Sequence, residues 1–234
     1  MPFEIKKFEF EANIKAPLRF AVISDLHGCD NEPILSAIEQ KNVDAVLVVG
    51  DFIHNNKIFE SGIEMLALCA KKWSTFCVLG NHEKRFNGNI KALVKETGAI
   101  CLDDNFFCFG GLVIGGLTSA HKSEKCEPNL EFLMDLSKEQ GFKCLLCHHP
   151  EYYEPYIKEL NIDLILSGHA HGGQWRFFGQ GIYAPGQGLF PKYTSGLYDG
   201  RLLVSRGLGN PHFIPRINNK SQIIIVDIKK PHLV

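Results

Sequence analysis

Short apolar runs recur along the chain, and each ends in a residue that can bind metal ions or move protons. The runs cover residues 20–24, 45–49, 75–79, 143–147 and 162–167. Runs of this length, bounded by glycine and polar residues, are typical of buried strands. Open α/β sheets bind their ligands at the carboxyl ends of such strands. The second run is followed by Gly50-Asp51, and because a buried carboxylate needs a compensating partner, Asp51 is the simplest centre for a cluster.

Amphipathic segments separate the first strands, and this alternation predicts a doubly wound α/β sheet with parallel pairing. The expected helices are 31–40, with Asn31 as its N-cap, 58–71, and 87–97, which Gly98 ends. From residue 99 the rhythm changes, and short segments at 100–102, 106–109 and 112–116 predict antiparallel hairpins. The other expected elements are an outer strand at 3–11, a polar loop at 118–129, a helix at 130–138, and strands at 202–205 and 222–228.

The composition is that of an ordinary globular protein, with 45% hydrophobic and 22% charged residues among 234. No repeat or linker divides the chain, so we expect a single domain over residues 1–234. The net charge of −1 offers no field that would recruit nucleic acid. The first residues do not resemble a signal peptide and no apolar run would cross a bilayer, so we expect a cytoplasmic protein without a transmembrane segment. No feature specifies an oligomeric state.

The eight cysteines form neither a metal-binding nor a disulfide pattern. Those that lie in apolar runs, where a free thiol behaves as a small buried hydrophobe, are Cys69, Cys77, Cys101, Cys108, Cys144 and Cys147. Cys144 and Cys147 match C-x-x-C, but on a strand their thiols would point to opposite faces. No second pair completes a zinc site, so we expect core cysteines in a reducing compartment.

Paired donors stand at two of the strand ends. Asp25 and His27 are two residues apart, as are His169 and His171, and in extended backbone such side chains share one face. Carboxylate, imidazole and amide donors without thiolate suit Mn, Fe or Zn in a mixed oxygen–nitrogen site. More donors are present than one tetrahedral ion needs, so two ions sharing a bridging carboxylate would use them all.

The order and spacing of these residues resemble the calcineurin-like metallophosphoesterases. The motif blocks are Asp25-x-His27, Gly50-Asp51, Gly80-Asn81-His82-Glu83, His148 and Gly168-His169-x-His171. The later sequence Ser205-Arg206-Gly207-Leu208-Gly209 resembles the tail of a bacterial branch of this family. The resemblance implies a four-layer α/β/β/α sandwich of the metallo-dependent phosphatase type, with a dinuclear site on its loops.

The resemblance also implies a role for each residue. The implied ligands are Asp25, His27 and His171 for one metal ion, and Asn81, His148 and His169 for the other. Asp51 would bridge both ions, and His82 would be the non-ligand histidine that faces the substrate in catalysis. The implied activity is hydrolysis of a phosphodiester or pyrophosphate bond by a metal-bridging hydroxide, with two divalent ions of Mn, Fe or Zn as cofactors.

Four residues near the motifs leave three alternatives open. His148 and His149 both precede Pro150, and the family's histidine usually stands two residues before the proline, which favours His148. His54 stands where family members often have a second acid, so it is either a loop histidine or a contact for a substrate phosphate. Arg206 would either reach a substrate phosphate or serve a structural role.

Two further interpretations compete with a phosphodiesterase acting on a phosphorylated small molecule. Hydrolysis of a lipid-linked pyrophosphate at the membrane surface would use the same metal ligands. A catalytically inactive protein-binding scaffold of the same fold would lack motif residues, and none is missing.

Aromatic residues are frequent between residues 175 and 193. They are Trp175, Phe177, Phe178, Tyr183, Phe190 and Tyr193. We expect them to belong to the core. Any that line the cleft would favour a substrate with a nucleobase or an apolar portion.

Overall fold

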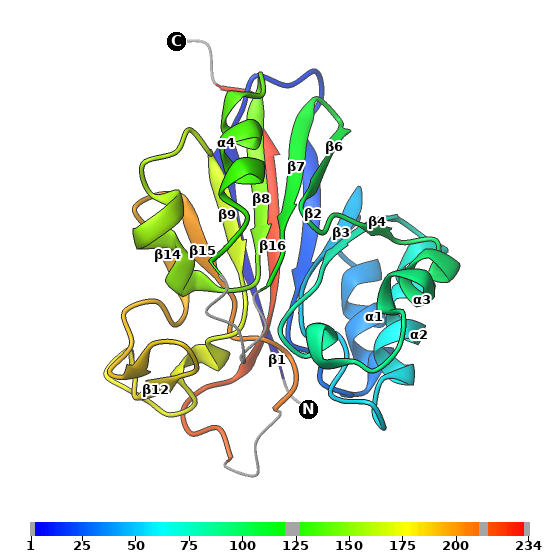
Figure 1. Ribbon diagram of the computed structural model, residues 1–234, viewed down its shortest axis with the longest axis vertical. Helices are drawn as coiled ribbons and strands as arrows, with labels where there is room; N and C mark the ends of the chain where they lie inside the picture. Colours follow the sequence, from blue (N-terminus) through cyan, green and yellow to red (C-terminus); the bar gives the residue numbers. More distant parts are fainter. Residues whose placement is uncertain (1–2, 120–126, 211–214, 232–234) are drawn as a thin grey trace.

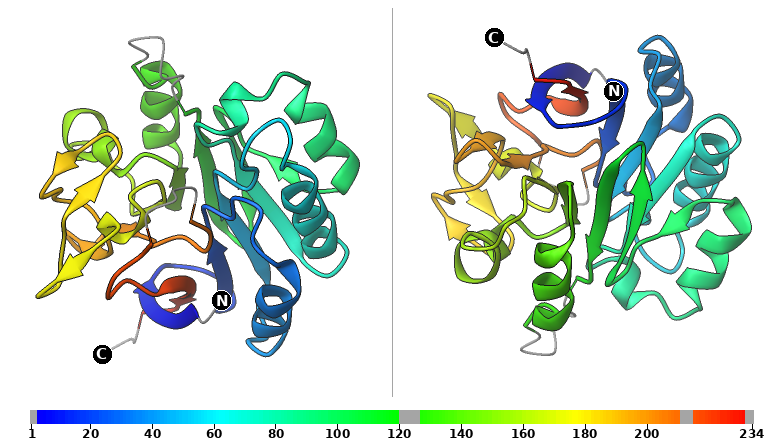
Figure 2. Two further views of the ribbon diagram at one scale, coloured as in Figure 1. Left: turned by 90° about the horizontal axis from the view of Figure 1, so that it is seen from below. Right: turned by 90° about the horizontal axis from the view of Figure 1, so that it is seen from above.

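The computed structural model describes residues 3–119, 127–210 and 215–231. Two six-stranded sheets pack face to face, and helices cover the outer face of each (Figure 1). The views along the long axis in Figure 2 show the order of the layers as helices, sheet, sheet and helices. This α/β/β/α sandwich is the fold that the resemblance implies.

The first sheet contains the strands that precede the amino-terminal motifs. Its order is β1 (Phe3–Glu11), β16 (Ser221–Lys229), β2 (Leu18–Ile23), β3 (Ala45–Val49), β4 (Ser74–Val78) and β5 (Ile100–Cys101). β2 to β5 pair in parallel, whereas β16 runs antiparallel to β2 and parallel to β1. β3 is buried at every position because layers cover both of its faces, which explains its continuous apolar sequence. β1 lies at the sheet edge, so the prediction of an outer strand is confirmed.

The second sheet contains the strands that precede the later histidines. Its order is β14 (Gly196–Tyr198), β15 (Leu202–Val204), β9 (Leu164–Ser167), β8 (Phe142–Cys147), β7 (Leu112–Leu117) and β6 (Asn105–Phe109). The four inner strands pair in parallel, and β14 and β6 close the two edges in antiparallel pairing. The carboxyl ends of the parallel strands in each sheet therefore point to one end of that sheet, where the motif residues follow.

The helices lie on opposite outer faces of the sandwich. They are α1 (Asn31–Glu39), α2 (Glu60–Ala70) and α3 (Ile90–Thr97) beside the first sheet, and α4 (Leu130–Lys138) beside the second. Asn89 and Asn129 cap α3 and α4, and Gly98 ends α3 in left-handed backbone as predicted. The N-cap prediction for α1 is wrong, because the preceding Asp30 and not Asn31 accepts the capping bond. No helix in the described parts of the chain combines the length and apolarity needed to span a membrane.

Short elements fill the loops near the sheet ends. They are helical turns at Glu83–Arg85, Pro150–Tyr152, Tyr153–Ile157 and His171–Gly173, one hairpin of β10 (Arg176–Phe177) and β11 (Gln180–Gly181), and another of β12 (Tyr183–Ala184) and β13 (Gly188–Leu189). These two hairpins lie outside the main sheets, at the lower left of Figure 1.

The core between the two sheets is formed by their facing side chains. It includes Phe20, Leu47, Phe76, Ile114 and Leu146. Cys144 belongs to this inter-sheet core, whereas Cys147 packs on the opposite face of β8 with the side chains of α4. The two C-x-x-C thiols therefore point to opposite faces, as predicted. Of the other cysteines expected in the core, Cys108 is exposed, because it lies on the edge strand β6.

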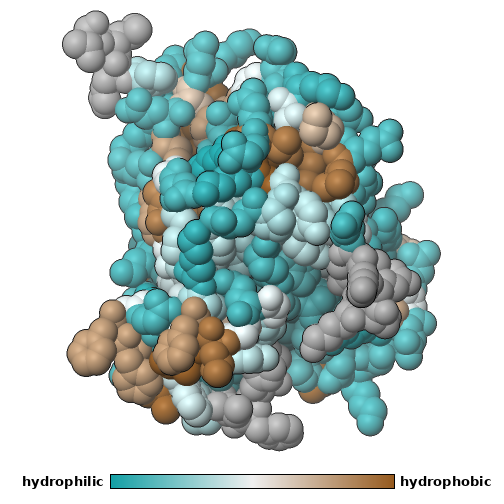
Figure 3. Space-filling view, turned by 60° about the vertical axis from the view of Figure 1, so that its left-hand side comes forward, coloured by the Kyte–Doolittle hydropathy of each residue, from teal (hydrophilic) through white to brown (hydrophobic). Residues whose placement is uncertain are grey.

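Two predictions about the chain beyond residue 99 are wrong. The segment at 100–102 does not start a hairpin, because α3 returns the chain so that β5 joins the first sheet in parallel with β4. Only β6 and β7 form the predicted antiparallel hairpin. Of the six aromatic residues between 175 and 193, only Tyr193 is buried, because the glycine-rich hairpins there have no further layer over them (Figure 3). Residues 120–126 of the predicted polar loop lie outside the described residues.

A buried carboxylate on β16, Asp227, ties three strands of the first sheet together. It accepts a hydrogen bond from Arg19 Nε at 2.6 Å and lies 2.9 Å from Lys7 Nζ. The bond from Arg19, helped by that from Lys7, lowers the pKa of Asp227 to about 2. An unfolded aspartate has a pKa of about 3.9, so the stabilisation is full above that pH and is lost as the pH falls through 2.

We expect Asp227→Asn to lower the free energy of unfolding by about 1–2 kcal/mol at pH 7 and by about half as much at pH 3. Urea unfolding at the two pH values measures the difference. The exposed Asp135→Asn on α4 is the control and should show no such pH dependence. Equal destabilisation by Asp227→Asn at both pH values would contradict the role of the charge.

Candidate metal centre

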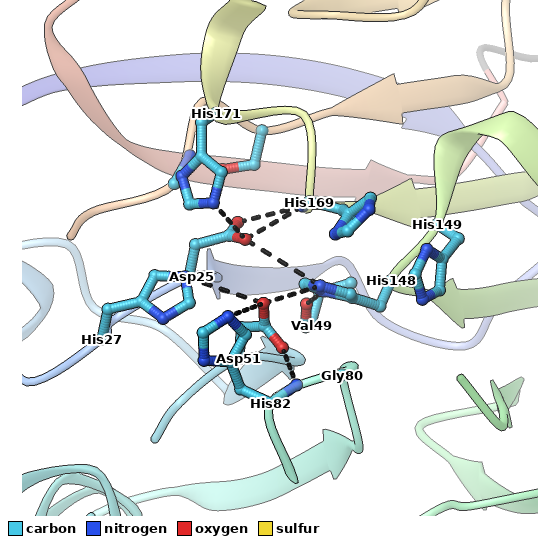
Figure 4. Close-up of polar contacts among 12 residues, drawn as sticks. Asp25, His27, Val49, Asp51, Gly80, His82, His148, His149, His169 and His171 are labelled. Carbon is cyan, nitrogen blue, oxygen red and sulfur yellow. Dashed lines mark hydrogen bonds and ion pairs between the residues drawn. The ribbon is translucent and has the colours of Figure 1, made fainter. Parts of the chain in front are cut away.

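The motif residues of the two sheets meet at one place. Asp25 and Asp51 follow β2 and β3 of the first sheet, and His148 and His169 follow β8 and β9 of the second (Figure 4). All four side chains are buried. The loops are joined by hydrogen bonds, since Asp25 N donates to Gly50 O at 3.0 Å and His169 N donates to the Asp25 carboxylate at 3.0 Å. The site therefore lies at strand ends, where the sequence pattern predicts it.

Five of the candidate residues adopt left-handed backbone. Asp25, His27, Asp51, His169 and His171 have φ between +46° and +64°. This conformation costs a residue with a side chain about 1 kcal/mol or more, and such residues cluster at functional sites. The side chains of the i, i+2 pairs do converge, but the expectation that extended backbone brings them together is wrong. Tight left-handed turns after the strands bring the side chains together instead.

One group of donors consists of Asp25, His27 and His171. A ligand atom from each lies within 4.8 Å of the other two. Nε2 of His171 is 3.6 Å from Asp25 Oδ1, and the ring centroids of His27 and His171 are 5.2 Å apart. These are the three residues that the resemblance assigns to one ion.

A second group consists of Asp51, His148 and His169, whose ligand atoms also lie within 4.8 Å of one another. The Nδ1–H of His148 donates to Val49 O at 2.8 Å, which leaves Nε2 to face Asp51 Oδ2 at 3.2 Å. Asp51 Oδ2 is also 3.6 Å from Nε2 of His27 in the first group. The Asp51 carboxylate therefore borders both groups, as a bridging ligand would.

Burial keeps most of the histidines in the form that binds metal. It lowers the pKa of His27 to about 3 and holds the pKa values of His169 and His171 well below the usual range. These three rings are therefore neutral at pH 7, and a neutral imidazole has a lone pair available for an ion.

His148 and the two carboxylates behave differently because they lie together. Burial alone would lower the pKa of His148, but Asp51 and Asp25 raise it to about 10. Burial alone would raise the pKa of Asp51, yet His148 holds it well below its usual range, whereas burial raises the pKa of Asp25. One imidazolium thus neutralises part of the charge of two buried acids, and a divalent ion would replace that proton.

Several buried polar atoms at this centre have no hydrogen-bond partner among the described residues. They are both ring nitrogens of His27 and Oδ1 of Asn81. A buried polar atom without a partner costs about 1–3 kcal/mol. Imidazole nitrogen, amide oxygen and the nearby carboxylates are a donor set that Mn, Fe and Zn accept. The residues therefore fit divalent metal ions.

His82 lies beside both groups and is half-buried. Its Nδ1–H donates to the backbone carbonyl of His54, so Nε2 faces Asp51 Oδ2 at 3.9 Å. The rings of His82 and His54 stack with centroids 5.6 Å apart, and His27 with His54 and His82 forms a further group with ligand atoms within 4.8 Å. His54 thus lies at the rim of the centre rather than on a remote loop.

Arg206 is paired with residues outside the two groups. Its Nη1 lies 2.9 Å from Glu4 Oε1, and its Nε donates to Ser195 Oγ at 2.8 Å. A substrate contact by Arg206 stays a prediction. Arg216, which the sequence did not single out, has Nη2 at 3.4 Å from Nδ1 of His171. A single arginine outside any motif block leaves no pattern by which it would be found.

Glu83 connects the loops that carry the candidate residues. Its carboxylate accepts hydrogen bonds from the backbone N–H groups of Asp51, Ile53 and Gly80 at 2.7–2.8 Å. Burial, together with the charge of Asp51, raises the pKa of Glu83 to about 8. Sequence reasoning assigned this residue no role, although its place directly after Asn81-His82 was a signal.

His149 lies beside the second group and pairs with Glu151. Its Nδ1 is 3.0 Å from Glu151 Oε1, and its ring centroid is 4.3 Å from that of His169. Glu151 Oε1 is also 3.7 Å from Nε2 of His169, and these three residues form a fourth group of donors. His148, by contrast, faces Asp51 directly. Glu151 follows Pro150 without any motif of its own, so the sequence did not indicate it.

Comparison with known proteins shows similarity to metal-dependent phosphoesterases. A family model of calcineurin-like phosphoesterases matches residues 18–173, two thirds of the chain. An uncharacterized metallophosphoesterase of Campylobacter jejuni is 29% identical over 249 residues, which cover 97% of this chain and 63% of that protein. Phosphodiesterase YaeI of Escherichia coli is 25% identical over 91% of this chain and 83% of its own length.

Other relatives extend further beyond the matched region. The chain spans only 39% of an uncharacterized metallophosphoesterase of Helicobacter pylori, to which it is 28% identical over 60% of its length. Among solved structures, the phosphopantetheinyl hydrolase of Mycobacterium tuberculosis superimposes with a TM-score of 0.52 and 15% identity, covering 85% of this chain and 92% of that one. At this identity the similarity shows the fold alone.

The three hydrogen bonds to Glu83 generate a prediction about metal affinity. Glu83→Gln keeps the side chain's shape but replaces one acceptor oxygen with an amide that cannot accept from backbone N–H. We expect Mn²⁺ to bind about 10–100-fold more weakly, because the loops of Asp51 and Asn81 lose their common anchor. Isothermal titration of chelator-treated protein measures the affinity. Glu96→Gln, on the exposed side of α3, is the control, and an unchanged affinity for Glu83→Gln would refute the anchoring role.

Proposed function

The chain belongs to the calcineurin-like phosphoesterase family, and from this premise we propose that it is a dinuclear metal-dependent hydrolase of phosphodiester or pyrophosphate bonds. The observation that carries the proposal is the Asp51 carboxylate, which borders two separate groups of buried donors. Membership of this family indicates a metal-dependent enzyme that acts on phosphorylated substrates. The number of ions, the bond and the role of each residue are our proposal.

The proposed ligands follow the two groups. One ion would be held by Asp25, His27 and His171, the other by Asn81, His148 and His169, and both would share Asp51. Bound divalent ions supply the Lewis acidity that activates water and neutralises charge on the phosphate. Mn, Fe and Zn all suit these donors. The orienting bond from His148 Nδ1–H to Val49 O directs Nε2 toward the centre, as outer hydrogen bonds do for metal-binding histidines.

His82 is proposed as the residue that protonates the leaving oxygen. The carbonyl of His54 accepts from Nδ1–H and thereby fixes the orientation of the ring, so that Nε2 faces the centre, where a proton on it can reach a leaving group. His54 and Arg206 are proposed to contact a substrate phosphate, His54 from the rim beside His82.

Three observations bear on the substrate and the location. The relative YaeI, which this chain covers over most of its length, is named a phosphodiesterase, which supports a diester. A phosphorylated small molecule is the first candidate, and a lipid-linked pyrophosphate is the second, favoured by the exposed aromatic side chains after His171. We propose that the protein acts as one domain. We also propose that it is cytoplasmic, because all seven described cysteines are free thiols, which suits a reducing compartment.

Model substrates test the proposed reaction. Chelated protein reloaded with Mn²⁺ is expected to hydrolyse bis-p-nitrophenyl phosphate faster than p-nitrophenyl phosphate. Asp51→Asn should reduce the rate by more than about 100-fold, beyond the usual effect of outer-sphere changes, whereas Asp135→Asn should not. A preference for the monoester would reject the diester assignment. Neither activity nor bound metal in the wild type would instead support a protein-binding scaffold.

A second prediction separates the acid from the ligands. His82→Ala should retain the wild-type metal content, measured by mass spectrometry, and lose about 10²–10⁴-fold in kcat on diphenyl phosphate. The loss should be smaller on bis-p-nitrophenyl phosphate, because p-nitrophenolate leaves without a proton. Loss of the metal together with activity would identify His82 as a ligand and not the acid.

A further inference from the structure

Exposed apolar side chains cover the two small hairpins that follow the metal-centre loop. They are Trp175, Phe177, Phe178, Tyr183, Leu189 and Phe190, here called the hairpin patch. Figure 3 shows apolar side chains gathered in the lower part of this face of the molecule. A contiguous exposed apolar surface marks a site of contact with a partner or a membrane.

The hairpin patch includes two phenylalanines in unfavourable backbone. Phe178 has φ of +51° and Phe190 has φ of +50°, a region where glycine or asparagine is preferred and a bulky side chain is disfavoured. Phe178 is fully exposed and Phe190 is 70% exposed, so packing within the described chain does not offset this cost. A phenylalanine is unfavourable both in left-handed backbone and in contact with water. Its presence under both conditions indicates that the side chain contacts another molecule.

The charge of this segment has one sign. Residues 172–198 contain Arg176 and Lys192 but no aspartate or glutamate. Arg176 is buried and donates to Gly172 O at 2.7 Å, so Lys192 is the exposed charge of the segment, two residues after Phe190. Its Nζ also lies 2.6 Å from Glu154 on the neighbouring helical turn. The segment has no acid of its own, and Glu154 is shared with Lys158, whose Nζ lies 3.3 Å away. This exposed cluster of two lysines and one glutamate therefore keeps a net positive charge, which complements anionic lipid headgroups.

The hairpins are tightly joined to the loop that carries His171. Ile182 N donates to Gly173 O at 3.0 Å and to Trp175 O at 2.9 Å. A Cβ on Gly173 would lie only 2.4 Å from Gly181 Cα, so the two backbones are in direct contact. A surface that binds the hairpin patch would therefore lie beside the metal centre.

We propose that the hairpin patch docks this protein on an anionic lipid bilayer, with Phe178 and Phe190 inserted below the headgroups. Projecting single rings would need a matching pocket on a protein partner, whereas fluid lipid accommodates them without one. Trp175 and Tyr183 suit the boundary between headgroups and acyl chains, and Lys192 suits anionic headgroups. The docking is reversible, because two rings and one cation bind far more weakly than a transmembrane helix. This inference goes beyond the phosphoesterase proposal and does not rest on it.

Co-sedimentation with vesicles tests the proposal. The full chain is mixed with vesicles of POPC alone or of three parts POPC and one part POPG, and we expect tighter binding to the anionic vesicles, weakened by salt. Phe178→Asn/Phe190→Asn should weaken partitioning by at least about tenfold. The same variant should melt at the wild-type temperature or higher, because asparagine tolerates left-handed backbone. Lys192→Gln should reduce only the preference for POPG.

Leu130→Gln/Met134→Gln, which changes two exposed apolar residues of α4, is the control and should bind vesicles like the wild type. Binding to neither vesicle, or equal binding by the asparagine variant, would overturn the proposal. Sedimentation velocity without lipid adds a further arm, since a dimer that the asparagine variant loses would assign the patch to a second copy and also overturn it. Hydrolysis of a soluble diester should be unchanged in the asparagine variant, so a failed activity assay leaves the lipid test valid.

Discussion

Two buried carboxylates at the junction of the sheets, Asp25 and Asp51, impose the constraint that the surrounding loops satisfy. A buried acid without compensation costs several kcal/mol, so each needs positive charge or hydrogen-bond donors nearby. Nε2 of His148 lies 3.2 Å from Asp51 and 4.0 Å from Asp25, and the backbone N–H groups of His82 and His169 donate to the two acids. Because these donors come from both sheets, charge compensation at the centre depends on the packing of one sheet against the other.

The same acids explain why the neighbouring loops contain glycine. A Cβ on Gly80 would lie 2.1 Å from Asp51 Oδ1, and one on Gly168 would lie 2.6 Å from Asp25 Oδ2. The tail that resembles the bacterial branch encloses Asp25 from another side, where Gly209 N donates to Asp25 O at 2.6 Å. Motif blocks that are far apart in the sequence therefore share one steric cause, the space that two carboxylates occupy.

The sequence predicted which side chains lie close together for two reasons. Buried strands can be recognised from their apolar runs, and the carboxyl ends of parallel strands lie at the same end of a sheet. β3 and α4 have the bounds that their patterns predict. The left-handed backbone of Asp25 and His27 was not predictable, because tertiary contacts select it over extended backbone. Glu83 was missed as an anchor because two of its three donors, the N–H groups of Asp51 and Ile53, lie 32 and 30 residues earlier in the chain, outside any local window. The assignment of each residue to an ion stays a prediction.

The exposure of the aromatic hairpins shows a different limit of sequence reasoning. Placing aromatic residues in the core assumes that stability of the folded chain alone decides their position. Phe178 and Phe190 contradict that assumption in both their φ angles and their exposure. Composition cannot distinguish a ring kept for packing from one kept for contact with another surface, since both raise the apolar content of the segment equally.

The position of β16 affects how the molecule is made. This late strand, residues 221–229, lies between β1 and β2, and β1 has no other neighbour in its sheet. During synthesis, one edge of β2 therefore stays unpaired until residues 221–229 have left the ribosome. Asp25 follows β2, so its loop reaches its final form only after that strand arrives. Metal uptake would thus follow the synthesis of β16, and before that point the chain has an unpaired strand edge of the kind that favours aggregation.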